Sequence, residues 1–134
     1  MIHLDTSFLV DLLREARREE PGPASRLLDQ LLDESLWISV FVACELAAGV
    51  ELSDRSAQER EAVVHLLEGL QVTYPDGRFS AAYGRVFAGL RRSGETLAAM
   101  DLLIAISALV DGATLVTRDL RHFERVPGLE FLSY

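Results

Sequence analysis

The chain has 134 residues, of which 49% are hydrophobic and 25% are charged, and it carries a formal net charge of −8. Length and composition favour one globular domain with its own hydrophobic core, spanning residues 1–134. The acidic balance argues against a general polyanion-binding domain, which is normally basic.

Short apolar runs alternate with segments whose apolar residues recur at helical spacing. The predicted strands are 2–4, 36–39, 71–74 and 114–116, with 129–132 as a possible fifth. The predicted helices are 6–14, one starting at Pro23, 40–48 closed by Gly49, about 54–67, 79–92 and 97–110. Residues 15–22 are charged and end in turn residues, so they indicate an exposed loop or a frayed helix end. Leu27, Leu28, Leu31 and Leu32 are expected on the inner face of the second helix.

Strands that alternate with helices predict an α/β fold with three layers, α/β/α, around a central, mostly parallel sheet of four to five strands. No apolar run approaches the length needed to cross a membrane, and the N-terminus lacks a basic region followed by a cleavable apolar stretch. We therefore expect a cytoplasmic protein. The single Cys44 allows no internal disulfide and fits a reducing compartment.

Four acidic residues lie in apolar surroundings or directly after a predicted strand: Asp5, Glu45, Asp101 and Asp119. Asp101 is the only charge from residue 96 to residue 110. An isolated buried carboxylate is costly, so such a residue normally has a partner or a metal ion. Ligands of parallel sheets bind beyond the carboxyl ends of the strands, where these residues are predicted to lie.

Taken singly, three of the acids also have simpler interpretations. Asp5 could cap the following helix, although Phe8 stands where a reciprocal cap would place Glu or Gln. Glu45 could pair with a distant arginine. Asp119 could cap a short turn or pair with Arg121. Asp101 has no local partner, so function is the better explanation there.

If the four acids converge, their mutual repulsion would raise their pKa values and destabilise the fold unless a cation is bound. Oxygen ligands without a nearby Cys or His pair favour Mg²⁺, with Mn²⁺ as the alternative. Such a site is suited to phosphodiester hydrolysis, with one ion or two.

Four segments resemble the signature regions of PIN-domain nucleases, most closely the VapC-type toxins of bacterial toxin–antitoxin pairs. They are Asp5-Thr6-Ser7-Phe8-Leu9, Ile38-Ser39-Val40 with Glu45-Leu46, Asp101-Leu102-Leu103-Ile104-Ala105, and Thr117-Arg118-Asp119 with Phe123. The resemblance covers the whole chain. It implies a Mg²⁺-dependent endoribonuclease that acts on RNA, forms homodimers and is inhibited by a cognate VapB-type antitoxin filling the acidic groove.

By the same resemblance, Asp5 and Asp101 are the principal catalytic metal ligands, Glu45 completes the site, and Asp119 binds metal directly or through water. Val42 and Ile106 depart from the family pattern, but neither change removes a ligand. The fourth acid varies in the family, which makes Asp119 the least secure of the four.

All 13 basic residues are arginine, a side chain suited to bidentate phosphate contacts. We hypothesise that Arg14, Arg17 or Arg118 contacts RNA phosphates. His122 could also contact substrate.

Two other classes of protein remain as alternatives. One is another enzyme with an acidic Mg²⁺ pocket. A receiver-like domain would need a lysine, which this chain lacks, and a dehalogenase-type phosphatase would need a second Asp where Ser7 stands, so both are disfavoured. A catalytically silent binding module would have no need to keep Asp5, Glu45 and Asp101.

Overall fold

The computed structural model describes all of residues 1–134 and contains a five-stranded, fully parallel sheet with strand order β3-β2-β1-β4-β5. The strands are β1 (Ile2–Leu4), β2 (Leu36–Ser39), β3 (Gln71–Thr73), β4 (Thr114–Val116) and β5 (Phe131–Leu132). In the centre of the sheet, His3 pairs in register with Trp37 on β2 and with Leu115 on β4. The predicted α/β class and the parallel sheet are confirmed.

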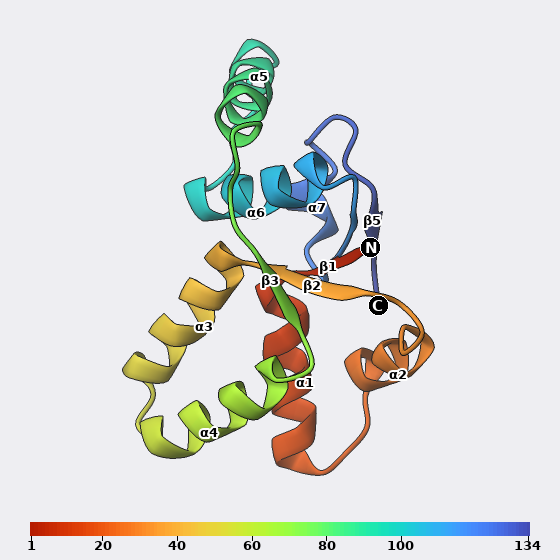
Figure 1. Cartoon of the computed structure of the whole chain (residues 1–134), viewed down its shortest axis with the longest axis vertical. Coiled ribbons are helices and arrows are strands. Elements are labelled where there is room, and N and C mark those ends of the chain that lie inside the picture. Colours follow the sequence, from red (N-terminus) through yellow and green to blue (C-terminus); the bar gives the residue numbers. More distant parts are fainter.

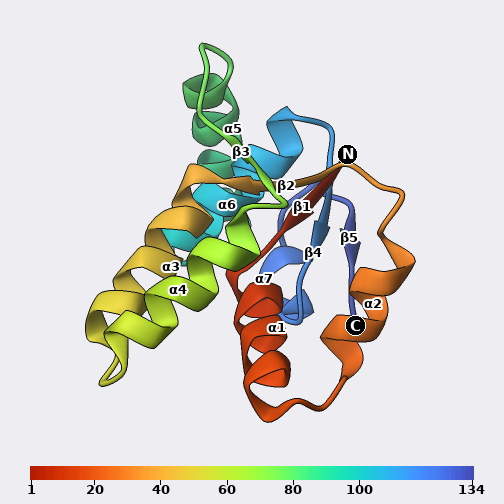
Figure 2. The same cartoon turned by 60° about the horizontal axis from the view of Figure 1, so that its bottom comes forward.

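Seven helices cover the sheet on both faces (Figures 1 and 2). They are α1 (Thr6–Arg18), α2 (Pro23–Gln30), α3 (Val40–Leu52), α4 (Ser56–Leu67), α5 (Phe79–Arg92), α6 (Ala99–Val110) and α7 (Leu120–Phe123). Helices α1 to α4 lie on one face and α5 to α7 on the other, because the strand order reverses direction after β3. The chain therefore forms three layers with the sheet in the middle.

The core lies on both sides of the central strands. Leu4, Ile38 and Leu115 are at most 1% exposed, and α1 places Phe8 against them from one face. Helix α6 is almost wholly apolar because it packs between the sheet and its neighbouring helices, with Ile106 fully buried. No helix is both long enough and apolar enough to span a bilayer.

Three local predictions were wrong, each because tertiary contacts set the outcome. Helix α3 continues past Gly49 to Leu52, so Gly49 is no C-cap. Leu32 is 70% exposed and lies outside the inner face expected for it. The first helix was predicted to end at residue 14 but continues to Arg18, so of the two alternatives for residues 15–22 the helix end fits residues 15–18.

The carboxylate of Glu15, in this last turn of α1, accepts backbone N–H groups at the start of α2, from Gly22, Ala24 and Ser25. Burial acts to raise the pKa of Glu15, but the hydrogen bonds from Ser25, Gly22 and Ala24 outweigh it and hold this pKa below its ordinary value. Glu15 thus caps α2, whose own N-cap, Gly22, has no side chain. The cap fixes α2 against α1.

Candidate active site

The candidate site lies where the carboxyl ends of β1 and β4 meet. Asp5 follows β1, and its backbone N–H donates to the carbonyl oxygen of Val116 at the end of β4, 2.9 Å away. Thr117 and Asp119 follow β4 at the same edge. Neighbouring parallel strands end together, so residues more than 110 positions apart in the sequence become neighbours.

The carboxylate of Asp5 is held by hydroxyl groups and not by an arginine or histidine side chain. Its side chain is buried at 5% exposure and accepts hydrogen bonds at Oδ2 from Ser7 Oγ, at 2.9 Å, and from Thr117 Oγ1, at 2.8 Å. Asp5 occupies the N-cap position of α1, yet its side chain makes no capping hydrogen bond. The capping interpretation is therefore wrong, and the carboxylate points to the site with no positive charge beside it.

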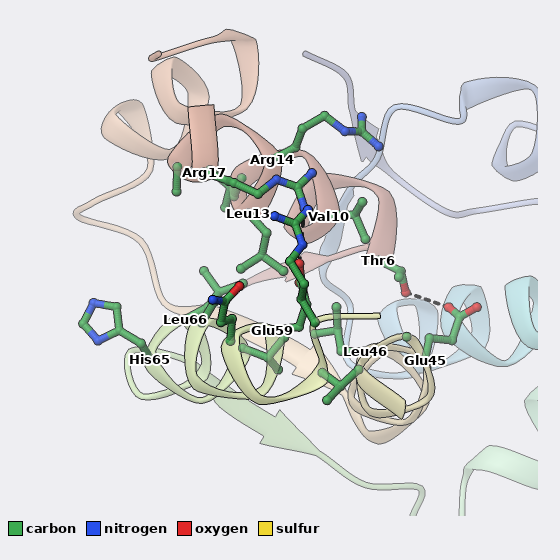
Figure 3. A pocket seen from close by; sticks show the side chains of 18 residues that line it. Thr6, Val10, Leu13, Arg14, Arg17, Glu45, Leu46, Glu59, His65 and Leu66 are labelled. Atoms are coloured by element: carbon green, nitrogen blue, oxygen red, sulfur yellow. Dashed lines mark hydrogen bonds and ion pairs between the residues drawn. The ribbon is translucent and has the colours of Figure 1, made fainter. Parts of the chain in front are cut away.

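Glu45 reaches the site from the second turn of α3. Ser39 caps this helix by accepting the N–H of Val42. Thr6 Oγ1 donates to Glu45 Oε1 at 2.6 Å, which joins α1 to α3 beside Asp5 (Figure 3). Glu45 forms no ion pair with an arginine, so that simpler interpretation is also wrong.

Asp101 and Asp119 face each other across one histidine. His122 Nδ1 lies 3.5 Å from Asp101 Oδ2 and 3.3 Å from Asp119 Oδ2. Asp101 is in the first turn of α6, whereas Asp119 begins α7 without capping it. The partner of Asp119 is His122, and Arg121 forms no ion pair with it.

The electrostatics of Asp101 connect all four acids. Burial is the main cause that raises the pKa of Asp101, and the negative charge of Asp5 raises it further. His122 opposes this shift, while Glu45 and Asp119 add to it. The four predicted acids therefore share one region of negative potential that no arginine neutralises.

The donor set fits a hard divalent cation in its chemistry, because it consists of carboxylate and hydroxyl oxygens with a net excess of negative charge. No group of three His, Cys, Asp or Glu side chains is already arranged to hold an ion. Glu45 is turned toward Thr6, and Asp5 toward Ser7 and Thr117. These hydrogen bonds occupy Oδ2 of Asp5 and Oε1 of Glu45, so the other oxygen of each carboxylate has no hydrogen-bond partner and could bind a metal ion.

A groove of about 570 Å³ leads away from the site between α1, α3 and α4 (Figure 3). Apolar side chains such as Leu13, Leu46 and Leu66 line its length, and Thr6 and Glu45 lie at its end. The groove is thus continuous with the acidic site.

The hydroxyl residues Thr6 and Thr117 were missed as site residues when the sequence was read alone. Thr117 is fully buried, and it also accepts the backbone N–H of Asp119 at 2.9 Å. Thr6 and Thr117 each stand next to a predicted acid or within two residues of one, at the end of a strand. That position was the available signal.

Fold and site together define an α/β domain with an acidic centre at the carboxyl edge of a parallel sheet. The PIN domain profile matches residues 2–129, and the chain belongs to the PIN-domain family. The predicted resemblance is confirmed.

Similar proteins include Ribonuclease VapC19 of Mycobacterium tuberculosis, 35% identical over 131 residues that cover 95% of each chain. Ribonuclease VapC1 of Haemophilus influenzae is 29% identical over 132 residues, covering 98% of this chain and 96% of the relative. Among solved structures, VapBC2 from Rickettsia felis, bound to a DNA fragment from its promoter, superimposes with a TM-score of 0.91 at 28% identity, covering 100% and 99% of the two chains.

Proposed function

We propose that this chain, acting as a single domain over residues 1–134, is a metal-dependent endoribonuclease and the toxin of a VapBC-type toxin–antitoxin pair. The observation that carries the proposal is the cluster of four carboxylates without an arginine partner, in which Asp101 has a raised pKa. Such repulsion destabilises the fold unless a cation is bound, so the cluster favours a functional site that holds a metal ion. The ribonuclease names of the relatives supply the substrate class.

In this proposal Asp5 and Asp101 are the principal metal ligands, Glu45 completes the site, and Asp119 binds directly or through water. Mg²⁺ is the expected ion, with Mn²⁺ as the alternative; it would supply the positive charge needed for phosphodiester hydrolysis. Ser7 and Thr117 orient Asp5. Thr6 keeps Glu45 close to the site before the ion binds.

The partner we propose is a VapB-type antitoxin that occupies the groove between α1, α3 and α4. The apolar walls suit one face of a partner segment, and the acidic end at Glu45 suits a basic side chain. Structures of VapBC complexes from Rickettsia felis and Haemophilus influenzae support such a partner. A homodimer and a cytoplasmic location, where RNA and antitoxin are available, complete the proposal.

The test is cleavage of a short single-stranded RNA by purified protein with Mg²⁺ and with EDTA. We expect Asp5→Asn and Asp101→Asn each to lower the cleavage rate at least about 100-fold, more than is usual for a residue that only supports a metal ligand. Asp29→Asn is the matched control, because it makes the same change at an exposed carboxylate of α2 that forms no hydrogen bond. Induced expression should arrest growth only with the wild type and the control.

Full cleavage by either site variant would show that the roles are wrongly assigned. A wild type that binds an antitoxin yet cleaves no RNA with Mg²⁺ or Mn²⁺ would favour the catalytically silent binding module. Hydrolysis of a simple phosphate monoester without RNA cleavage would favour another phosphohydrolase.

A further inference from the structure

A second charged cluster lies along α1, outside the four acids. Asp11 is 8% exposed, and its carboxylate accepts hydrogen bonds from two arginines and one tyrosine. Arg14 Nη1 donates to Oδ1 at 2.8 Å, and Arg118 Nη1 donates to Oδ1 and Oδ2 at 2.8 and 2.7 Å. Tyr134 Oη donates to Oδ2 at 2.8 Å, and its ring packs edge-on against Phe8. The buried carboxylate therefore holds both arginines in place.

The two guanidinium groups keep donors free for a ligand. The side chains of Arg14 and Arg118 are 42% and 55% exposed, and each uses only Nη1 on Asp11. A guanidinium carries five N–H donors, so most remain available. Two positive charges against one negative charge leave the cluster with a net charge of +1.

The cluster is tied directly to the acidic site. The backbone N–H of Arg118 donates to Ser7 Oγ at 3.2 Å, and Ser7 in turn donates to Asp5. Asp11 follows Asp5 by six residues along the start of α1, which corresponds to roughly 9 Å of helix rise. Phosphates adjacent to a scissile bond at the acidic site would pass within reach of these arginines.

Arg17, the third arginine of the hypothesis made from the sequence, is placed differently. Arg14, Arg17 and Glu59 all line the groove, but Arg17 Nη1 pairs with Glu59 of α4 at 3.2 Å, whereas the side chain of Arg14 points away from α4 (Figure 3). Arg14 and Arg118 share one carboxylate and lie beside the site, so the geometry favours these two.

We propose that Arg14 and Arg118, oriented by Asp11, form a binding site for one backbone phosphate of single-stranded RNA next to the scissile bond. The proposal rests on the proposed function, because it assumes that RNA is cut at the acidic site. A phosphate suits the site because a pair of planar guanidinium groups can donate several charge-assisted hydrogen bonds to its oxygens.

Substitution of Asp11 separates two explanations, because they predict opposite changes in RNA affinity. If only local charge mattered, Asp11→Asn would remove one negative charge and strengthen RNA binding. If orientation by Asp11 matters, the same change frees both arginines and weakens binding. Arg118→Lys is a second test, since it keeps the charge but replaces the planar fork by a single ammonium.

The experiment measures binding of a fluorescent 12-nucleotide oligouridine by anisotropy at several salt concentrations, with Ca²⁺ in place of Mg²⁺. We expect Arg14→Gln and Arg118→Gln each to weaken binding about fivefold to tenfold at 0.1 M salt. Each should also reduce the slope of log affinity against log salt, and the double variant Arg14→Gln/Arg118→Gln should reduce it by about 0.7, the value for the one single-strand phosphate that the two arginines share. Asp11→Asn and Arg118→Lys should weaken binding at least about twofold. Arg26→Gln, at an exposed arginine of α2 without an ion pair, is the matched control and should not change it.

Binding and salt slope equal to the control in both glutamine variants would overturn the proposal, even if binding of an antitoxin were impaired. Tighter RNA binding by Asp11→Asn would also overturn the proposal. If Asp11→Asn fails to fold, wild-type RNA affinity in Arg118→Lys would overturn the proposal in its place. Cleavage with Mg²⁺ is scored separately on the same RNA. If the wild type binds but never cleaves, the proposed function fails while the binding series still decides on the phosphate site; if it neither binds nor cleaves, both fail.

Discussion

Thr117 offers a direct test of how the acidic site is held together. Its side chain is fully buried, and its hydroxyl donates to Asp5 Oδ2 at 2.8 Å while accepting the N–H of Asp119 at 2.9 Å. Thr117→Val keeps the shape of the side chain and removes the hydroxyl alone. Asp5 then keeps the hydrogen bond from Ser7, so its carboxylate loses one of its two hydroxyl donors.

The expected cost follows from these contacts. A hydrogen bond to a charged group contributes about 1.5–3 kcal/mol. The backbone N–H of Asp119 also loses its partner, but this group is only partly buried and can bind water, so its loss adds little. We therefore expect Thr117→Val to lower the free energy of unfolding by about 2–3 kcal/mol. Thr117→Ser keeps the hydroxyl and loses one buried methyl group, at a cost of about 1 kcal/mol.

The assay is equilibrium unfolding in urea with EDTA present, so that metal binding does not contribute. The slope of free energy against urea concentration should stay equal among the variants, which makes the comparison valid. A loss below about 0.5 kcal/mol in the valine variant, or a serine variant as unstable as the valine variant, would refute the reasoning, because the hydroxyl would then not support Asp5.

Three further outcomes are expected. Glu15→Gln should lower the free energy of unfolding by about 1 kcal/mol at neutral pH. Because the folded pKa of Glu15 is lowered, its contribution to stability is present above the ordinary glutamate pKa and is lost as pH falls through the folded value. The urea unfolding curves of the wild type and the variant should therefore converge in acid. Asp101→Asn should stabilise the metal-free protein at neutral pH. Burial and the charge of Asp5 raise the folded pKa of Asp101, so the wild type loses stability as pH rises through that value. A variant that is no more stable than the wild type at pH 7 would contradict this prediction. Mg²⁺ at about 100 times its Kd should stabilise the wild type by about 2.7 kcal/mol, and a thermal shift of equal size in Asp101→Asn would mean that the ion binds elsewhere.

The sheet could be predicted because its signal is local. Residues 2–4 and 114–116 are short apolar runs bounded by polar or turn residues, and a central parallel strand needs little more. Helix ends depended on contacts that the sequence does not show. Gly49 suggested an end by its type alone, yet nothing at that position requires a left-handed backbone, and the helix continues.

The four acids could be predicted because each is an isolated charge after a strand or within an apolar helix. Their partners could not, since the hydrogen bond from Thr117 to Asp5 spans 112 positions. Asp11 was overlooked for the same reason. Its carboxylate interrupts the buried face of α1 between Phe8 and Leu12, but its partners Arg118 and Tyr134 come from the opposite end of the chain.

The net charge of −8 constrains how such a protein could take hold of RNA. An acidic surface cannot steer a polyanion from a distance, so association would depend on contacts formed within about one Debye length, roughly 10 Å at 0.1 M salt. Near the acids, the cluster at Asp11 holds two arginines, Arg14 and Arg118, whose side chains are 42% and 55% exposed. Salt then weakens the attraction of the arginines and the repulsion by the rest of the surface together, so the affinity should fall less steeply with salt than for a basic nuclease. A steep slope, equivalent to many phosphate contacts, would require more basic contacts than the two arginines at Asp11 provide.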